Sequence, residues 1–152
     1  MFGKEVQTAE PGDSVGVVVN RLPQTERGDV ISYPQDRAEV PESFVAEIIL
    51  FSEREIKNND ELLIRCGTAE KKCRVGRILE KIDPVNLTLD TKFPEALKGG
   101  DVGKLELSPL EPMCLERYSE FPELGRFVVE GRKGTAAAGI VLETQISSER
   151  IA

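Results

Sequence analysis

The sequence predicts an all-β fold, either a barrel or a sandwich of short antiparallel strands. About nine or ten short runs show the two-residue period of a β-strand, turn signals separate them every ~8–12 residues, and no long helix is indicated. Only 5% of the 152 residues are aromatic, so we expect a core of Val, Ile and Leu. Many short strands with frequent turns are typical of β-barrels and β-sandwiches.

The N-terminal part of the chain contains two strand-like runs. Residues 14–19 follow a turn built on Pro11 and Gly12, and residues 29–33 follow an arginine–glycine pair. Prolines and charged residues then accumulate, which predicts a linker over residues 37–42.

Beyond the linker, strand-like runs follow one another closely. They cover residues 43–51, 61–66, 70–83, 102–110, 113–118, 125–130 and 135–143, with 84–89 as a further short candidate. The pattern becomes ambiguous around Ile78, which indicates a bend or a bulge. Residues 92–101 indicate a single helical turn that ends at two glycines.

Composition excludes several classes of function. The chain has no histidine, which removes the most common general base and the most common metal ligand. Its three cysteines include no CxxC pair, so neither a zinc site nor a disulfide framework is indicated. We therefore predict no catalytic residue, no cofactor and no metal, and we expect that the chain is not an enzyme.

Charge and hydropathy limit the classes of binding partner and the cellular compartment that we expect for the chain. The net charge of −7 argues against a uniformly basic nucleic-acid-binding protein but leaves room for a local basic surface. No apolar run approaches the ~20 residues that span a bilayer, and the N-terminus lacks the apolar stretch of a signal peptide. We expect a cytoplasmic protein that does not contact membranes.

The segment "GRKGT", residues 131–135, has some features of a phosphate-binding loop. The spacing of its glycines differs from the P-loop pattern, and a strand-like run rather than a helix follows it. A hairpin turn is the simpler interpretation, with Gly131 and Gly134 supplying positive φ angles.

Several segments, taken in order, resemble the translation elongation factor Tu and elongation factor 1-alpha family. "MFGKEVQTAEPGDSVGVVVNRL" and "ERGDVIS" resemble the closing strands of the family's second domain. The segments that resemble its third domain are "FVAEIILFS", "CGTAEKKCRVGRILEKID", "ALKGGDVGKLEL", "EPMCLERYSEFPELGRFVV" and "GTAAAGIVL". The resemblance covers about residues 1–143 and is most specific at "LERYSEFPELGRF", which a glycine-rich strand follows.

This resemblance implies a fold and a domain organisation. Residues 43–146 would form a six-stranded antiparallel Greek-key barrel of the third-domain type, and 147–152 a tail. Residues 1–36 would supply about three closing strands of an incomplete second barrel, joined by the linker 37–42. The family's GTP-binding domain has no counterpart here, so we expect a natural truncated relative or a fragment. Because an open strand edge is prone to association, we expect residues 1–36 to pack on the complete barrel, to pair with another copy of the chain or to pair with a partner chain.

The resemblance also implies contact residues for tRNA. Gly131, Arg132 and Lys133 occupy the loop that in the family approaches the T-stem backbone of aminoacyl-tRNA. Arg65 and Arg117 fall near other positions at which family members contact tRNA phosphates, and such cations suit sequence-independent contacts. The implied function is the C-terminal β-barrel binding module of a translation elongation factor-like GTPase, not catalytic alone, contacting tRNA or a protein partner.

Three positions depart from the family pattern. Glu130 stands where an arginine is usual, Gly134 where a polar or basic residue is usual, and Gly67 where a histidine is frequent. Much of the family's pocket for the aminoacyl end also lies outside this chain. We therefore expect only weak binding of aminoacyl-tRNA by the chain alone, and we keep a GTPase domain or another protein as an alternative partner.

Two other branches share the same barrels. "ERGDVI" and "GTAEKKCRVGRILEKIDPVNLTL" also resemble the large subunit of sulfate adenylyltransferase, in which the barrel would brace a GTPase. The selenocysteine-specific elongation factor is a further possibility, and "LGRF" favours the elongation-factor branch. A further alternative is a structural or assembly domain that does not bind nucleic acid.

Overall fold

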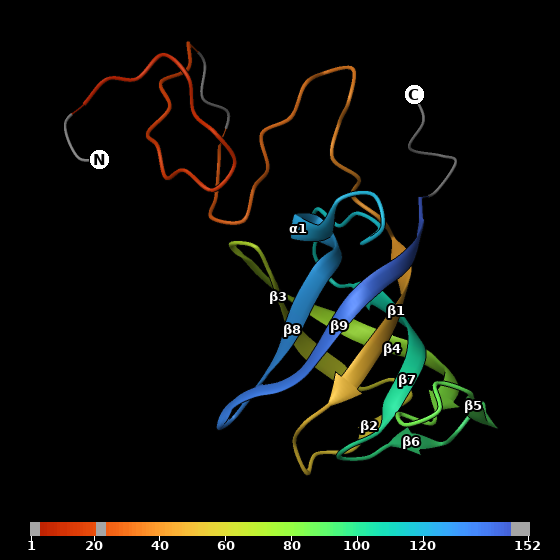
Figure 1. Cartoon of the computed structure of the whole chain (residues 1–152). Coiled ribbons are helices and arrows are strands. Elements are labelled where there is room, and N and C mark those ends of the chain that lie inside the picture. Colours follow the sequence, from red (N-terminus) through yellow and green to blue (C-terminus); the bar gives the residue numbers. More distant parts are fainter. Residues whose placement is uncertain (1–3, 21–23, 147–152) are drawn as a thin grey trace.

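The computed structural model describes residues 4–20 and 24–146, and within them the fold is all-β, as predicted (Figure 1). One helical turn, α1 (Pro122–Gly125), interrupts the series of strands. The strands are β1 (Ser43–Leu50), β2 (Ile56–Lys57), β3 (Glu61–Cys66), β4 (Ala69–Ile82), β5 (Leu89–Lys92), β6 (Ala96–Leu97), β7 (Val102–Pro109), β8 (Arg126–Gly131) and β9 (Gly134–Gln145).

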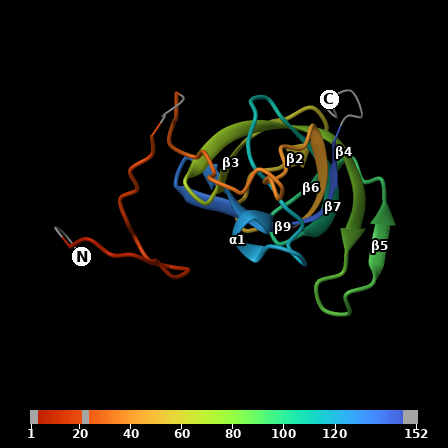
Figure 2. The same cartoon turned by 90° about the horizontal axis from the view of Figure 1, so that it is seen from above.

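Six of the strands close into an antiparallel barrel, which Figure 2 shows from above. They are hydrogen-bonded in the order β3-β8-β9-β1-β7-β4, and the pairing of β4 with β3 completes the ring. β5 adds to the other side of β4, while β2 and β6 form a separate small sheet. The connection from β7 to β8 crosses one end of the barrel, where the Tyr118 N–H donates to the Val141 carbonyl at 2.9 Å. The predicted six-stranded Greek-key barrel is confirmed.

The alternation of side chains along the strands builds the core. In β1, Phe44, Ala46, Ile48 and Leu50 are at most 1% exposed, and the residues between them face outward. Phe44 meets Phe127 of β8 edge to face, with ring centroids 6.0 Å apart. Such a contact stabilises the fold by about 0.5–1.5 kcal/mol beyond the stabilisation from burying the rings. Within the described ranges, no polar or charged side chain is buried.

β4 is long because it pairs with three neighbouring strands. Its first half pairs with β3, its second half with β7, and its end with β5. The register with β7 shifts between Val75 and Arg77 and again between Ile78 and Glu80. A bulge bends a strand and increases its twist, which allows β4 to leave one neighbour for the next. The irregularity predicted around Ile78 is confirmed.

The closing strands of a second barrel, predicted over 1–36, are not formed in the described part of that segment. Residues 4–20 and 24–42 contain no strand, and the isolated bridge there joins Tyr33 to Asp36. Val18, in the middle of the run 14–19, is 99% exposed. A strand is stable only with hydrogen-bonded neighbours, and none of the described residues pairs with this run. The remaining residues 1–3 and 21–23, like the predicted tail 147–152, lie outside the described residues.

Two predictions between β4 and β7 were also wrong. Residues 92–101 form no helical turn, because Ala96–Leu97 pairs as β6 with β2 and Gly100 makes a turn with a φ of 88°. The short strand expected over 84–89 begins only at Leu89, because Asp83 organises the preceding residues into a turn by accepting the Val85 N–H at 2.8 Å.

The strand predicted over 113–118 is absent for a different reason. Met113 and Leu115 are buried at 4% and 0% exposure inside the connection that crosses the end of the barrel. Their apolar alternation therefore reflects a plug over the core rather than a sheet. α1 follows, and its residue Gly125 is buried against the same connection.

Candidate nucleic-acid interface

The β8–β9 hairpin carries the glycine-rich segment singled out in the sequence. Gly131 pairs with Gly134 at the end of the ladder, and Arg132 and Lys133 form the exposed tip. Gly134 has a φ of 114°, as predicted for a hairpin glycine. Gly131 does not have the predicted positive φ; instead it lies close to Ala136, to whose Cβ a side chain at 131 would come within 3.1 Å.

The two cations at this tip are available to an external anion. Within the part of the chain that the structure describes, neither Arg132 nor Lys133 forms an ion pair. A long cationic side chain at a projecting turn can contact phosphate without displacing an internal partner.

Arg65 lies on β3 in a different electrostatic setting. Its guanidinium is 3.3 Å from the Glu70 carboxylate and 3.5 Å from that of Glu130. The side chain is half exposed, so each pair contributes little to stability. The two carboxylates nevertheless offset the positive charge that a phosphate would need.

Arg117 belongs to the connection before α1. Its carbonyl accepts the N–H groups of Glu120 and Phe121 at 3.0 and 2.9 Å, and its guanidinium is 3.7 Å from the Glu120 carboxylate. This arrangement forms the turn that leads into the helix.

The five predicted contact residues lie at successive positions along β8. Arg117 lies beside the start of the strand, Arg65 pairs in register with Val128 at its middle, and the tip follows its end. Six residues of strand span roughly 16 Å. The structure therefore gathers Gly131, Arg132 and Lys133 at one end of β8 and leaves Arg117 at the other.

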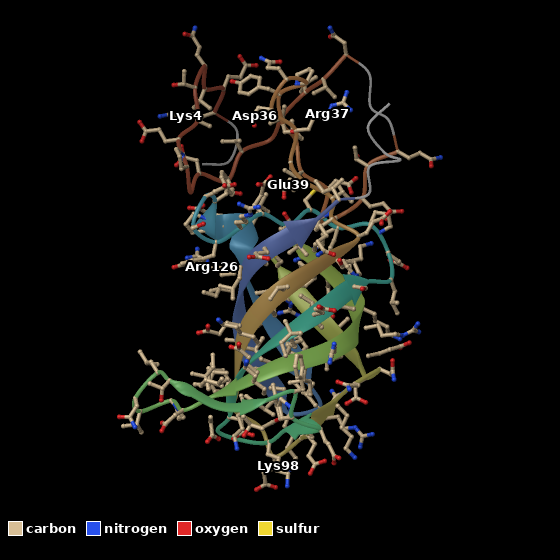
Figure 3. All side chains as sticks on the ribbon, turned by 90° about the vertical axis from the view of Figure 1, so that its right-hand side faces the viewer. Lys4, Asp36, Arg37, Glu39, Lys98 and Arg126 are labelled. Carbon is tan, nitrogen blue, oxygen red and sulfur yellow. The ribbon has the colours of Figure 1, made fainter. Side chains whose placement is uncertain are left out.

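Arg126 is a surface cation that the sequence interpretation did not single out. It is the first residue of β8, it is exposed, and it projects from the barrel beside α1 (Figure 3). None of the ion pairs found in residues 4–20 and 24–146 involves it. The alternation of "RFVVE", with Phe127 and Val129 inward, would have placed Arg126 on the outer face with Arg65.

A shallow groove of about 790 Å³ runs over this outer face. Arg65 and Arg126 border it, together with Tyr118. Its floor is mostly apolar and comes from β8, β9, β1 and β7, and the β4–β5 turn also lines it. The apolar residues concerned are Val128, Ala138, Ile140, Ile49, Val102 and Leu87. An apolar floor with cations at one side suits a protein surface better than it suits an extended nucleic acid.

The acidic and thiol side chains of the described residues are the candidates for metal ligands and nucleophiles. In residues 4–20 and 24–146, no three His, Cys, Asp or Glu side chains come together as a metal site requires. Burial raises the pKa of the Cys66 thiol to about 11 and that of Cys73 to about 12. Thiols with such pKa values stay protonated at neutral pH and are poor nucleophiles.

No helix in the described residues is long and apolar enough to cross a bilayer.

A family model described as GTP-eEF1A C-terminal domain-like matches residues 43–142, which are the barrel. The chain belongs to this family. Elongation factor 1-alpha of Saccharolobus solfataricus is 34% identical over 144 residues, covering 93% of this chain and 33% of the relative. Elongation factor 1-alpha of Methanopyrus kandleri is 32% identical over 151 residues, covering 95% of this chain and 36% of the relative. The chain thus spans about a third of the length of these relatives.

Solved structures show the same fold for this elongation factor 1-alpha-like domain. The crystal structure of sup35 complexed with GDP matches with a TM-score of 0.67 at 22% identity, covering 73% of this chain and 27% of that chain. The complex of sup35 with GMPPNP gives a TM-score of 0.68. The resemblance predicted from the sequence is confirmed for the family and for the barrel, and the five predicted contact residues remain predictions.

Proposed function

We propose that this elongation factor 1-alpha-like domain is a non-catalytic binding module that contacts the phosphate backbone of aminoacyl-tRNA in the cytoplasm. The observation that carries the proposal is the projecting β8–β9 tip, where Arg132 and Lys133 are exposed and have no acidic partner among the described residues. Phosphate contacts of this kind position a nucleic acid without reading its sequence.

The electrostatics of the rest of the surface support weak binding. Arg65 already lies between two carboxylates, and the chain carries a net charge of −7. A phosphate at Arg65 would have to approach Glu70 and Glu130 as well. The tip and the exposed Arg126, which forms no ion pair among the described residues, therefore supply most of the attraction, and affinity should fall steeply with salt.

Titration of aminoacyl-tRNA against the whole chain at 25 and 200 mM salt tests this function. We expect measurable binding at low salt that weakens at high salt. The double variant Arg132→Ala, Lys133→Ala should weaken binding and reduce the slope of log affinity against log salt by about one to two units.

The control variant removes two positive charges elsewhere. Lys4 and Arg37 lie on the segment that precedes the barrel (Figure 3), and Figure 1 shows this segment at the opposite end of the barrel from the β8–β9 tip. The double variant Lys4→Ala, Arg37→Ala should change the slope much less than the tip variant. Binding that is independent of salt, absent at low salt, or equally sensitive to both double variants would overturn the proposal.

The apolar groove favours a second candidate, a protein partner such as a GTPase domain. Val128 and Ile140 on its floor are half-buried and face outward. Ile140→Asp should abolish binding to an added elongation factor GTPase domain in a calorimetric titration, while the tip double variant should leave it intact. If neither ligand binds, the domain has a structural or assembly role.

A further inference from the structure

The valine-rich run 14–19 presents an apolar face to the solvent. Val15 is 46% exposed, Val17 64% and Val19 40%. In an extended chain alternate residues point to the same side, so these three valines share one face, and Asp13 precedes them on it. An exposed apolar face of this kind marks a site of association.

The floor of the apolar groove contains a row of residues that lie opposite one another on neighbouring strands. Val128 of β8 pairs with Ala138 of β9. Ala138 also pairs with Ile49 of β1, which pairs in turn with Val102 of β7. Arg65 of β3 pairs with Val128 and therefore stands at one end of the row. The row thus reads as one cation followed by four apolar residues.

The spacing of the run matches the spacing of the row. Neighbouring strands lie about 4.8 Å apart, so the row extends over roughly 14 Å from Val128 to Val102. Residues on the same side of an extended chain are about 6.8 Å apart, so Val15 to Val19 also extend over roughly 14 Å. With the valines over the apolar residues, Asp13 reaches the end of the row at which Arg65 stands.

Charge sets the direction in which the run would lie. Arg126 borders the groove near the same end, on the outer face of β8 with Val128, and it forms no ion pair in the described part of the chain. The Asp13 carboxylate accepts the Glu10 N–H through one oxygen at 2.9 Å, which leaves its second oxygen for a guanidinium. The opposite direction would place this carboxylate at Val102, without a cation.

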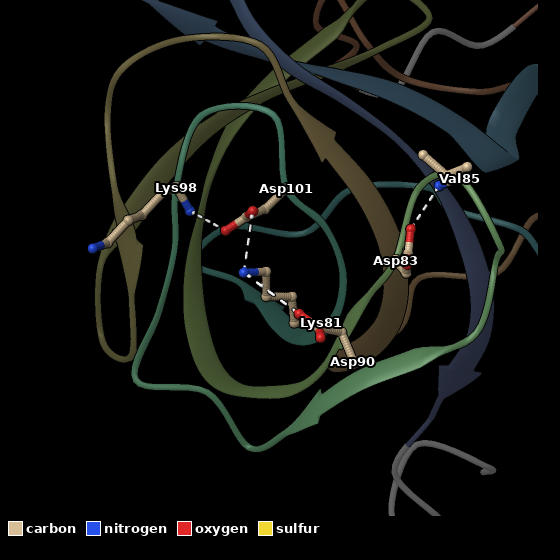
Figure 4. A network of polar contacts seen from close by, with 6 residues as sticks. All are labelled: Lys81, Asp83, Val85, Asp90, Lys98 and Asp101. Carbon is tan, nitrogen blue, oxygen red and sulfur yellow. Dashed lines mark hydrogen bonds and ion pairs between the residues drawn. The ribbon is translucent and has the colours of Figure 1, made fainter.

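Polar contacts hold the elements that line the groove. The Asp83 carboxylate fixes the β4–β5 turn by accepting the Val85 N–H at 2.8 Å (Figure 4). The Lys81 ammonium lies 3.5 Å from the carboxylate of Asp101, which precedes Val102 of the row (Figure 4). The groove is therefore already ordered, and an occupant would not have to organise it.

We propose that the chain forms a two-fold symmetric homodimer in which residues 13–19 of each copy lie across the apolar groove of the other. Within one chain the run does not cover the groove, because Figures 1 and 2 show residues 4–20 beside the barrel rather than over β9 and β1. Every copy carries both surfaces, so a mutual exchange closes the dimer. This contact is a docking of side chains on the barrel and not the pairing of strand edges expected for residues 1–36.

The dimer is independent of tRNA binding but not of the second candidate function. The β8–β9 tip does not line the groove, so Arg132→Ala, Lys133→Ala should leave the dimer intact. A GTPase domain bound in the groove would displace the run of the second copy. Because the dimer is measured without any added partner, its failure is distinguishable from the failure of either proposed function.

Sedimentation equilibrium of the whole chain over a wide concentration range measures the dimer. The contact area is small, so we expect a dissociation constant of roughly ten micromolar. Val17→Asp on the run and Ile49→Asp in the row should each raise this constant about tenfold or more, because a carboxylate would lose water against an apolar surface. Circular dichroism of each variant checks that the barrel stays folded.

Val18→Asp is the matched control. Val18 is 99% exposed and points to the side opposite Val17 in an extended chain, so this aspartate would face the solvent in the dimer. The dissociation constant should change less than about twofold.

Mixing two disrupted variants gives the decisive measurement. The Val17→Asp chain keeps an intact groove, and the Ile49→Asp chain keeps an intact run, so a heterodimer of the two retains one of the two docking contacts, whereas each variant alone retains neither. A one-to-one mixture should therefore associate at concentrations at which each variant is monomeric. The proposal is overturned if the natural chain stays monomeric at millimolar concentration, if Val18→Asp is as disruptive as Val17→Asp, or if the mixture associates no better than its components.

Discussion

The Thr144 hydroxyl donates a 2.6 Å hydrogen bond to the Glu39 carboxylate, joining the segment before β1 to the end of β9. Glu39 also binds the crossing connection twice. Its N–H donates to the Glu116 carboxylate at 2.9 Å, and its carbonyl accepts the Leu115 N–H at 3.1 Å. One residue of the predicted linker therefore fastens three parts of the chain at the same end of the barrel.

Removing the Thr144 hydroxyl should destabilise the barrel. Thr144→Val keeps the shape of the side chain but leaves the half-buried Glu39 carboxylate without this donor, which should lower the free energy of unfolding by about 1–2 kcal/mol. Urea denaturation measures the change. Ser43→Ala removes an exposed hydrogen bond to Gln145 nearby and should cost less than about 0.5 kcal/mol. Equal effects of the two substitutions would contradict a special role for Glu39.

Only a glycine fits at position 125, because the backbone of the crossing connection packs directly against it. A Cβ at this position would overlap the Tyr118 backbone and lie 2.9 Å from the Glu116 carbonyl oxygen. Gly125→Ala should therefore lower the free energy of unfolding by about 3 kcal/mol or more. Gly76→Ala in β4, where the nearest atoms are 3.7 Å away, should change it by less than about 1 kcal/mol. Thermal unfolding of both variants makes the comparison, and a tolerated alanine at 125 would refute it.

The parts of the fold that the sequence predicts well are those in which burial follows a strict period. β1, β3 and β7 alternate clearly, and the structure forms each of them close to the expected bounds. The errors occur where alternation arises from something other than a sheet. The apolar residues of 113–118 plug the barrel, and the valines of 14–19 have no neighbouring strand in the described residues.

The candidate site was predicted only in part, because ion pairing depends on which strands become neighbours. The exposed tip at Arg132 and Lys133 follows from the turn signal alone. The neutralisation of Arg65 by Glu130 requires β3 to pair with β8, which no local pattern shows. Arg126 was missed although the alternation of its own strand indicates an outward side chain.

The turn at Asp83 should weaken in acid. The N–H groups of Val85 and then Asn86 hold the pKa of the Asp83 carboxyl below its ordinary value. A lowered pKa means that the contribution of this group is present above the unfolded-state pKa and is lost as the pH falls through the folded-state pKa. An NMR titration of the Val85 amide should show a midpoint below 3.8. Asp83→Asn should remove this transition, and a midpoint at or above the ordinary value would contradict the assignment.

The buried thiols should make the barrel less stable in alkali. Burial raises the pKa of Cys73 from 9.0 to about 12, so the folded chain keeps a proton that the unfolded chain releases near pH 9. Below pH 9 the thiol is protonated in both states, so its contribution to the free energy of unfolding does not change with pH. Above pH 9 this contribution falls by about 1.4 kcal/mol for each pH unit, up to the folded-state pKa. Urea denaturation at pH 7, 9 and 10.5 measures this slope. Cys73→Ala should lower stability at pH 7 through the lost packing but should flatten the loss between pH 9 and 10.5. A variant with the same alkaline slope as the natural sequence would show that Cys73 ionises as readily in the folded chain as in the unfolded one.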